Sequence, residues 1–462
     1  MIFTSFDFVF FILILFVLYW AIGRKEIQNV LLLLASYLFY GWVTPWFCIL
    51  LASSSVADYF IGLGMKHYPD RKKQFLIFSL IVNLGFLSFF KYYNFFAENV
   101  HAALTTIGLH PEPWVLSIVL PVGISFYTFQ SLSYTIDVYR GNLEARKNII
   151  DFMLFVSFFP QLVAGPIERA THLIPQIEAK RTFSWNIIGH AIPFLVRGYL
   201  KKLVIADNVS IYADKVFMLD HPSILLLIAG ALAFTVQIFA DFSAYTDIAR
   251  GSAILFGFKL MQNFNLPYIA ISPSDFWRRW HISFSSWIRD YLYIPLGGSK
   301  GKTLLGFGIV LIVSMGLSGL WHGASWHFVV WGLYYALLLF IYHFLGFGGK
   351  WKPKGFLKNI IAWIIMFSFT IFGWILFRTS DLHWLANVFK NASSGFSGDS
   401  LVVSIEIIVF VIYYSIPLFM FMFLDKVVPD KKWIHSTVYA LSIIAICIFF
   451  RDKGLDFIYF QF

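Results

Sequence analysis

Two histidines in the motif SGLWHGASWHF are the residues best suited to acid–base chemistry. His322 and His327 interrupt a stretch that is otherwise apolar from 304 to 346. An unperturbed imidazole has a pKa of about 6.5, so it can accept or donate a proton near neutral pH. Gly319 and Gly323 flank His322, which predicts that a substrate chain can approach its ring closely. We therefore expect His322 to be functional, and His327 to be a histidine hydrogen-bonded inside a helix bundle.

A metal site fits these two histidines poorly. They are five positions apart, which on one helix separates them by about 140°, whereas a two-histidine zinc face needs a spacing of four. No cysteine lies near them in the chain. The sequence predicts no metal and no bound cofactor.

A second polar stretch, SPSDFWRRWHISFSSWIRDYLYIPLGGSKG, covers residues 272–301. Ser272, Pro273 and Asp275 predict a helix start, since they supply a cap, a proline in the first turn and a carboxylate near the N-terminus. His281 lies nine residues after Ser272. Its type and surroundings are compatible with either a structural or a functional histidine.

A helix rich in tryptophan and arginine is predicted to follow that start. Such a cluster is typical of a helix at the cytoplasmic headgroup level of a membrane. The same cationic face could instead recruit an anionic donor, such as a coenzyme A or a carrier-protein phosphopantetheine group. The residues concerned are Trp277, Arg278, Arg279 and Trp280.

A third polar stretch, QIFADFSAYTDIAR, carries ionisable residues inside an apolar region. Gln237, Asp241 and Tyr245 recur at a spacing of four and share one helical face. Asp247 and Arg250 could pair. Ionisable groups at membrane depth are candidate functional residues, so this face either lines a substrate path or forms a polar seam that locks neighbouring helices.

The composition places these motifs in a membrane. Of the 462 residues, 59% are hydrophobic and only 13% are charged, whereas soluble domains carry about 25% charge. A soluble enzyme, a disordered chain and a disulfide scaffold are thereby excluded. The net charge of +10 would suggest nucleic acid in a soluble protein, but here we assign it to loops that set topology and expect no nucleic-acid partner.

Apolar runs long enough to cross or enter a bilayer recur along the whole chain. Arg24 and Lys25 follow the first run, which predicts an N-terminus on the outside. The loops 91–113 and 378–400 are poor in Lys and Arg and are predicted to be translocated. The runs cover 6–22, 28–43, 46–65, 74–90, 114–138, 148–164, 186–206, 223–240, 243–258, 304–320, 326–346, 357–377, 401–424 and 435–450.

Some of these runs are too polar to span. Residues 148–169 and 271–300 are predicted to be re-entrant or membrane-surface helices, which need protein or a water-filled cavity to satisfy their backbone. There is no Ser/Gly linker and no internal repeat, so we predict a single domain over 1–462. The missing repeat also argues against a transporter or flippase, which commonly has inverted repeats.

The chain resembles the membrane-bound O-acyltransferase (MBOAT) family, and within it the bacterial branch active in alginate O-acetylation. The resemblance is carried by FYTFQSLSYTIDVYRG, FFPQLVAGPIER, ADFSAYTDIARG, FWRRWHISFSSWIRDYLYIPLGG, SGLWHGASWHFVVWG and the C-terminal FIYFQF. It implies an all-α polytopic membrane protein, with about eleven transmembrane helices plus re-entrant and membrane-surface helices around a central tunnel. It also implies that His322 is the essential catalytic residue and that His281 is a second site residue.

The resemblance further implies the reaction and its setting. We expect transfer of an acyl group, with acetyl favoured, from acetyl-CoA or an acyl-carrier thioester to a surface polysaccharide across a bacterial inner membrane. A periplasmic or surface SGNH-type acetyltransferase is the implied partner, besides the lipid bilayer. Asp241, Tyr245, Trp321 and Gly323 join the tryptophan and arginine cluster as candidate lining of the donor path or tunnel.

Other functions remain open at this point. Peptidoglycan or another surface glycan is the alternative acceptor to alginate, and D-alanyl transfer to teichoic acid ranks below both. A transporter, a flippase or a structural subunit without chemistry would not need His322.

Overall fold

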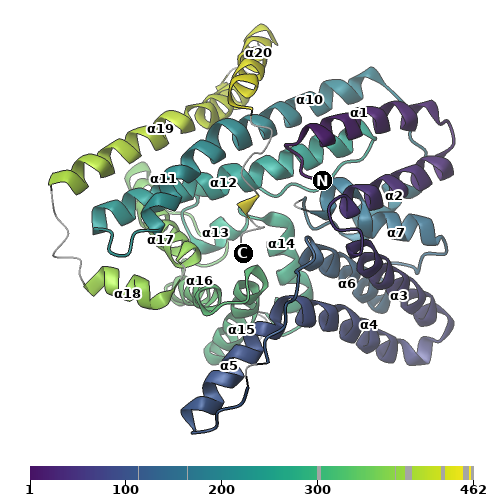
Figure 1. Ribbon diagram of the computed structural model, residues 1–462, viewed down its shortest axis with the longest axis horizontal. Coiled ribbons are helices and arrows are strands. Elements are labelled where there is room, and N and C mark those ends of the chain that lie inside the picture. The colour runs from purple at the N-terminus through teal and green to yellow at the C-terminus, as the bar shows by residue number, and fades with distance from the viewer. Residues whose placement is uncertain are drawn as a thin grey trace. The chain divides into compact units, whose positions relative to one another are not determined.

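The computed structural model describes residues 1–458 apart from 113, 164, 299–302, 380, 391–397, 428–431 and 451–456. Within these residues the secondary structure is helical throughout (Figure 1). Its α-helices are α1 Phe6–Ala21, α2 Lys25–Gly41, α3 Phe47–His67, α4 Lys72–Leu87, α5 Tyr93–Thr106, α6 Ile124–Arg140, α7 Ile149–Ser157, α8 Phe159–Leu162, α9 Ala170–Glu178, α10 Trp185–Tyr199, α11 Asp207–Phe217, α12 Ile224–Leu255, α13 Pro273–Trp277, α14 Ile282–Ile288, α15 Leu304–His322, α16 Trp326–Phe344, α17 Phe356–Arg378, α18 Leu382–Lys390, α19 Gly398–Val427 and α20 Lys432–Phe449.

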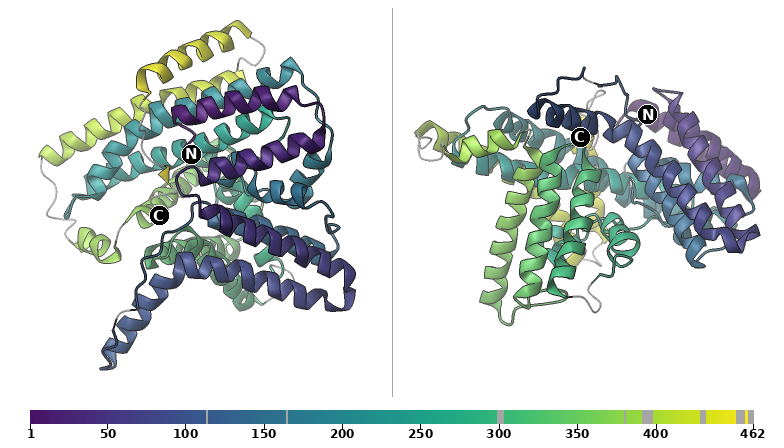
Figure 2. Two further views of the ribbon diagram at one scale, coloured as in Figure 1. Left: turned by 45° about the vertical axis from the view of Figure 1, so that its right-hand side comes forward. Right: turned by 90° about the horizontal axis from the view of Figure 1, so that it is seen from below.

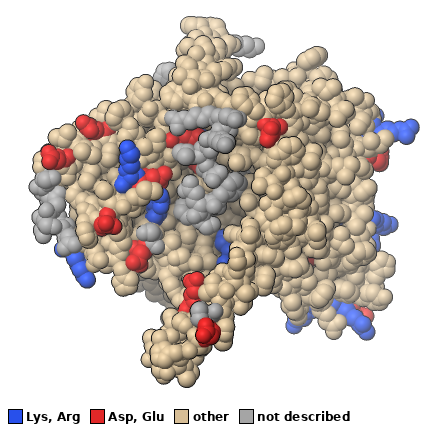
Figure 3. Space-filling model, viewed as in Figure 1, with Lys and Arg blue, Asp and Glu red and all other residues tan. Residues whose placement is uncertain are grey.

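Seven described helical segments are long and apolar enough to cross a membrane, which confirms a multi-pass, all-helical protein. The space-filling view agrees, because Lys, Arg, Asp and Glu are sparse on the face that it shows (Figure 3). The segments are Phe47–His67, Pro69–Thr106, Ile224–Leu255, Leu304–His322, Trp326–Phe344, Phe356–Arg378 and Gly398–Phe421.

Contacts divide the chain into two compact units. Unit 1 comprises Met1–Ala191, Ser252–Met261 and Gly323–Ser325, and unit 2 comprises Ile192–Gly251, Gln262–His322 and Trp326–Phe462. Every contact discussed below lies within one unit. A single domain over 1–462 stays a prediction.

Two predicted boundaries are wrong. The runs 223–240 and 243–258 are one continuous helix, α12 (Ile224–Leu255), because Asp241 at the predicted break is paired with Lys202 inside the protein. Helix also continues past the predicted loop start at 91, through the π-helical turn Ser88–Tyr92 and on to Thr106. Helix continues past Asp241 because that carboxylate has a buried partner. It continues past residue 91 through a change of helical geometry.

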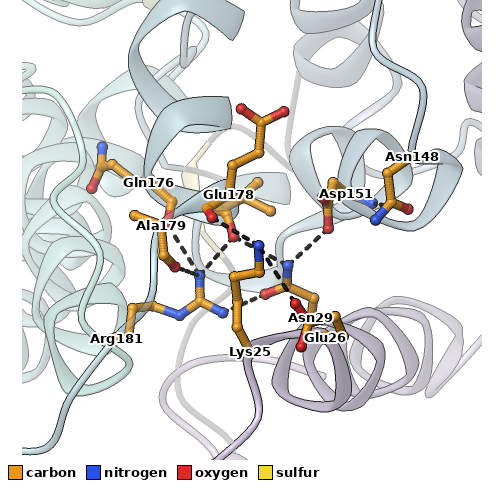
Figure 4. Close-up of polar contacts among 10 residues, drawn as sticks. Lys25, Glu26, Asn29, Asn148, Asp151, Gln176, Glu178, Ala179 and Arg181 are labelled. Atoms are coloured by element: carbon orange, nitrogen blue, oxygen red, sulfur yellow. Dashed lines mark hydrogen bonds and ion pairs between the residues drawn. The ribbon is translucent and has the colours of Figure 1, made fainter.

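A polar network in unit 1 binds the partly buried cation Arg181. The Arg181 guanidinium donates to the backbone oxygens of Gln176, Ile177 and Ala179 at the end of α9 and to the side-chain oxygen of Asn29 on α2 (Figure 4). A cation at a helix C-terminus is favoured by the carbonyls that have no partner there.

The same network joins α2 to α7. Asn29 Nδ2 donates to Asp151 Oδ1 at 2.8 Å, and the Asn148 side chain caps α7 by accepting from two backbone amides (Figure 4). Lys25 Nζ donates to the Glu178 backbone oxygen at 2.9 Å. These polar contacts thus hold the start of α7 and the end of α9 within unit 1, whatever their depth in a bilayer.

In unit 2, α15 and α16 approach each other more closely than side chains normally allow. These helices and α17 run side by side (Figure 2, right). A Cβ atom on Gly319 would overlap the backbone oxygen of Phe328, and one on Gly332 would overlap that of Met315. Only glycine fits at such a crossing, and small residues are the usual means of close helix packing in membranes.

This close crossing of α15 and α16 predicts the effect of adding one methyl group. Gly319→Ala or Gly332→Ala should lower the free energy of unfolding by about 1–3 kcal/mol, the usual cost of overpacking. Gly316→Ala on the same helix is the matched control, because its Cβ would meet the nearest Leu333 atom at 3.6 Å, an ordinary contact. Thermal unfolding of the purified protein in detergent measures the stability of each variant. Equal melting temperatures for Gly316→Ala and Gly332→Ala would contradict the close crossing.

Candidate active site

His322 lies at the last residue of α15 and is enclosed by aromatic rings. Its side chain is buried, at 4% exposed, and its ring centroid lies 5.0 Å from Trp331, 5.3 Å from Phe377 and 5.6 Å from Phe284. These rings belong to α16, α17 and α14. Such packing fixes the orientation of the imidazole and keeps bulk water away from it.

His281 is positioned by a break between two short helices. Ser272 caps α13 as predicted, with its side chain accepting from the Asp275 amide, but α13 ends at Trp277. The expected helix through the whole tryptophan and arginine cluster is therefore wrong. The physical reason is that His281 takes a left-handed backbone conformation, with φ of 43°, which ends one helix before α14 begins.

The His281 ring is fully buried and uncharged. Neither ring nitrogen has a hydrogen-bond partner among the described residues, and burial lowers the pKa of this imidazole to about 3. A buried polar group without a partner is uncommon and points to a ligand or a water. At neutral pH His281 can thus offer one donor and one acceptor but no positive charge.

Two aromatic side chains contact both histidines. Phe284 lies 5.0 Å from the His281 ring and 5.6 Å from the His322 ring. Trp321 lies 6.1 Å from His281 and 5.0 Å from His322, and it stacks on Phe284 at 4.3 Å. Residues 41 positions apart in the chain are thereby brought into one cluster in unit 2.

His327 stands apart from this cluster. α15 ends at His322 and α16 begins at Trp326, so the two histidines lie on different helices and the argument from one helical face is wrong. The role expected for Gly319 is also wrong, because its missing side chain makes room for α16 rather than for a substrate. Gly323 directly follows α15 and is buried.

A cavity of about 710 Å³ in unit 2 approaches the histidine cluster. Phe284 lines it, as does Ser318, one helical turn before His322 on α15. Its lining on α15 begins at Phe307, so the cavity runs roughly 16 Å along that helix. Basic side chains at the wall are Arg278, Arg289 and His343.

Polar atoms in the cavity wall are available to a ligand. Trp277 Nε1 and Ser314 Oγ are buried and lack a hydrogen-bond partner in the described part of the chain. Arg278 Nη1 donates to the Gly349 backbone oxygen at 2.7 Å, which holds this side chain at the wall. The cavity therefore combines an apolar wall with a few polar groups, as small-molecule sites do.

The predicted tryptophan and arginine cluster divides into two pairs. Trp277 and Arg278 line the cavity, whereas Arg279 pairs with Asp275 at 3.0 Å and Trp280 is buried against Trp374 at 4.7 Å. Among the basic lining residues, sequence reasoning missed Arg289 and His343. Arg289 could have been found from the sequence, because it lies in the WIRDYLY part of the polar stretch 272–301. His343 lies at the end of an apolar helix, and nothing in the sequence marked it as a cavity residue.

Asp241 and Tyr245 form a polar seam with Lys202. Lys202 Nζ lies 3.0 Å from Asp241 Oδ1 and 2.9 Å from Asp207 Oδ1, with all three side chains buried. Asp241 Oδ2 accepts from the Ile458 amide at 2.8 Å, and Tyr245 packs on Phe457 at 4.1 Å. These contacts favour the seam over a substrate path.

Two further expectations concern neighbouring residues. Asp247 pairs with Lys201 at 2.6 Å rather than with Arg250, because Lys201 on the π-helical turn Leu200–Ala206 reaches it across α12. The described residues contain no group of three or more His, Cys, Asp or Glu that could hold a metal. The last four residues of the FIYFQF motif lie outside the described residues.

Comparison with known proteins identifies the family of the chain. Residues 144–379 match the model of the membrane-bound O-acyltransferase family, MBOAT. A probable alginate O-acetylase of Pseudomonas syringae pv. tomato is 41% identical over 83% of this chain and 73% of its own, and one of Pseudomonas aeruginosa is 42% identical over the same shares. A peptidoglycan O-acetyltransferase of Helicobacter pylori is 35% identical over 80% of this chain and 74% of its own.

The chain belongs to the MBOAT family, and it is an O-acyltransferase of that family. Its aromatic histidine cluster and the adjoining cavity lie entirely within the matched residues.

The polar seam of Asp241, Tyr245 and Lys202 predicts an effect on stability that is separate from the acyl-transfer chemistry. Lys202→Met leaves two buried carboxylates without this cation and should cost about 3–5 kcal/mol of unfolding free energy. Lys215→Met, at an exposed position on α11, is the control and should change little. Thermal unfolding measures both. If Lys202→Met kept the wild-type melting temperature but lost activity, a substrate path would replace the seam.

Proposed function

We propose that this protein transfers an acetyl group from a cytosolic thioester, acetyl-CoA or an acyl-carrier thioester, to a hydroxyl, for O-acetylation of an extracytoplasmic polysaccharide. One observation carries the proposal. The cavity of about 710 Å³ places basic residues at its wall and ends one helical turn from His322. A slender thioester arm can thus bring its carbonyl toward the imidazole while its anionic part meets Arg278 or Arg289.

The chemistry assigned to His322 is general-base catalysis. Its ring nitrogen removes the proton from the acceptor hydroxyl as that oxygen attacks the thioester carbonyl. The carbon–sulfur bond then breaks, and the thiolate takes the proton back from the imidazolium. The products are an ester and a thiol, and the base is regenerated.

His281 is the proposed second site residue. Because its ring is neutral at pH 7 and contacts the same two aromatic side chains as His322, it is suited to hydrogen bonding. It would orient the acceptor or stabilise the developing oxyanion. Trp321 completes the wall between the two imidazoles, and Trp277 Nε1 is available to the donor.

The proposed setting is a bacterial inner membrane, with the N-terminus outside and about eleven spanning helices around the tunnel. The basic segment Lys350–Lys358 directly follows Gly349, to which Arg278 is bonded. Basic loops stay on the cytoplasmic side. This charge asymmetry supports entry of the donor from the cytosol at that end of the cavity.

Alginate-type acetylation is the proposed role, supported by the two Pseudomonas relatives at 41% and 42% identity. In such a system a separate periplasmic or surface SGNH-type acetyltransferase places the group on the glycan. The Helicobacter pylori relative at 35% identity favours peptidoglycan as the second candidate acceptor.

The general-base role predicts how two variants behave. A positioned base contributes about 10² to 10⁴ in rate, so His322→Ala should abolish O-acetylation of the surface glycan. His322→Gln should be equally inactive, because glutamine can hydrogen-bond but cannot accept the proton. The measurement is the ester content of the glycan in cells that carry equal amounts of each variant.

Two controls bracket this prediction. His327→Ala should retain activity, since that ring lies on α16 outside the histidine cluster, and His281→Ala should be slowed without being necessarily inactive. Acetylation by His322→Gln at a rate near wild type would refute the general-base assignment.

The cavity also predicts which arginine binds the donor. Arg278→Gln should raise the apparent KM for acetyl-CoA by about five- to tenfold, since it removes one charged hydrogen bond at a half-exposed position. Arg279→Gln is the matched control, because Arg279 does not line the cavity. Equal KM values for the two variants would leave Arg278 as a headgroup anchor.

A further inference from the structure

One wall of the cavity beside His322 is made by a loop rather than by a helix. This mouth loop, residues 345–355, connects α16 to α17, and all residues named below belong to unit 2. Its backbone packs on His343, which is exposed, whereas Ser318, the lining residue nearest to His322 along α15, is buried. The loop therefore lies at the open end of the cavity. Its lining residues are Gly346, Gly348 and Gly349.

Two glycines provide hinge positions near the ends of the mouth loop. Gly346 and Gly355 have φ of 76° and 97°, in the left-handed region that side chains rarely adopt. A Cβ atom on either would meet no described atom within 4 Å beyond its own chain neighbours, so glycine is needed for the backbone conformation and not for space. Loop positions of this kind can absorb the backbone rotation of a moving segment.

Between these hinges the loop forms a compact turn. The Trp351 backbone N–H donates to the Gly348 oxygen at 3.2 Å. The rings of Phe347 and Trp351 lie 4.6 Å apart, one on each side of the turn. Residues 347–351 can thus move as one piece.

A single side-chain hydrogen bond fastens this turn to the opposite wall. Arg278 Nη1 donates to the Gly349 backbone oxygen at 2.7 Å. In the described part of the chain, no other side chain hydrogen-bonds to residues 345–352, and the other partner of Arg278 is Asp275 at 3.4 Å. A phosphate offers a guanidinium two charged acceptors in place of one neutral carbonyl oxygen. An anionic ligand in the cavity can therefore displace Gly349 from Arg278.

We propose that the mouth loop is a lid on the donor cavity, and that the anionic part of the thioester donor opens it by taking Arg278 away from Gly349. This inference rests on the donor proposed above. Without a donor, the hydrogen bond holds the loop across the open end of the cavity and limits the access of water toward His322. While a donor is bound, its phosphate occupies Arg278 and the loop stays displaced. Opening of the cavity is thereby coupled to the presence of the anionic ligand.

Amide hydrogen exchange at residues 345–355, followed by mass spectrometry of the full-length protein in a neutral detergent, tests the lid. Arg278→Gln should speed exchange in this loop by about five- to tenfold, because one charged hydrogen bond at a half-exposed position is lost. Arg279→Gln is the matched control. It removes the same charge one residue away, but Arg279 bonds to Asp275 and to the Asn265 backbone oxygen, so exchange in the loop should not change.

Three ligands separate the anionic part of the donor from its neutral arm. Acetyl-CoA and adenosine 3′,5′-bisphosphate should each speed exchange at 345–355 in the wild type to about the rate of Arg278→Gln. S-acetylpantetheine has no phosphate and should leave the rate unchanged. A ligand that merely covered the loop would slow its exchange, so an increase reports release of the lid.

The remaining outcomes distinguish the lid from the donor assignment. Equal exchange of α15 in all samples shows that the variants are folded. Binding of acetyl-CoA with unchanged or slower exchange at 345–355 would overturn the lid and leave the proposed donor intact. Unchanged exchange in Arg278→Gln would also overturn it. If acetyl-CoA did not bind, faster exchange in Arg278→Gln and with adenosine 3′,5′-bisphosphate would support the lid, and the donor assignment would fail instead.

Discussion

The close crossing of α15 and α16 is the constraint on which the candidate active site depends. Gly319 and Gly332 let each backbone touch the other helix directly, so Trp331 on α16 comes within 5.0 Å of the His322 ring. A larger residue at either glycine would separate the helices and loosen the aromatic enclosure. Van der Waals packing of this kind replaces the hydrophobic driving force that is missing between helices in lipid.

Buried charges impose the second constraint, and the chain meets it by local pairing. Lys202 lies between two carboxylates in unit 2, and in unit 1 Arg181 binds the backbone oxygens at the end of α9. Lys202 is buried, where an unpaired charge would cost several kcal/mol, and Arg181 is partly buried. Because Asp241 is paired with Lys202, α12 can run through this polar position without a break.

One irregular stretch of backbone lies at the candidate active site. The break at His281 separates α13 from α14, and residues on either side of it, Trp277 and Phe284, line the cavity that leads to His322. Broken helices are tolerated at membrane depth only where protein or a cavity satisfies the backbone, and here residues on both sides of the break line a cavity.

The sequence alone determined the class of the protein, the position of most helices and the cap at Ser272. These follow from composition, from runs of apolar residues and from short motifs, all of which are local. Tertiary structure alone decided the packing role of Gly319, the pairing of Asp247 with Lys201, and the presence of Arg289 and His343 in the cavity wall. Each of these depends on which distant residue lies opposite, and spacing along one segment carries no information about a partner on another helix.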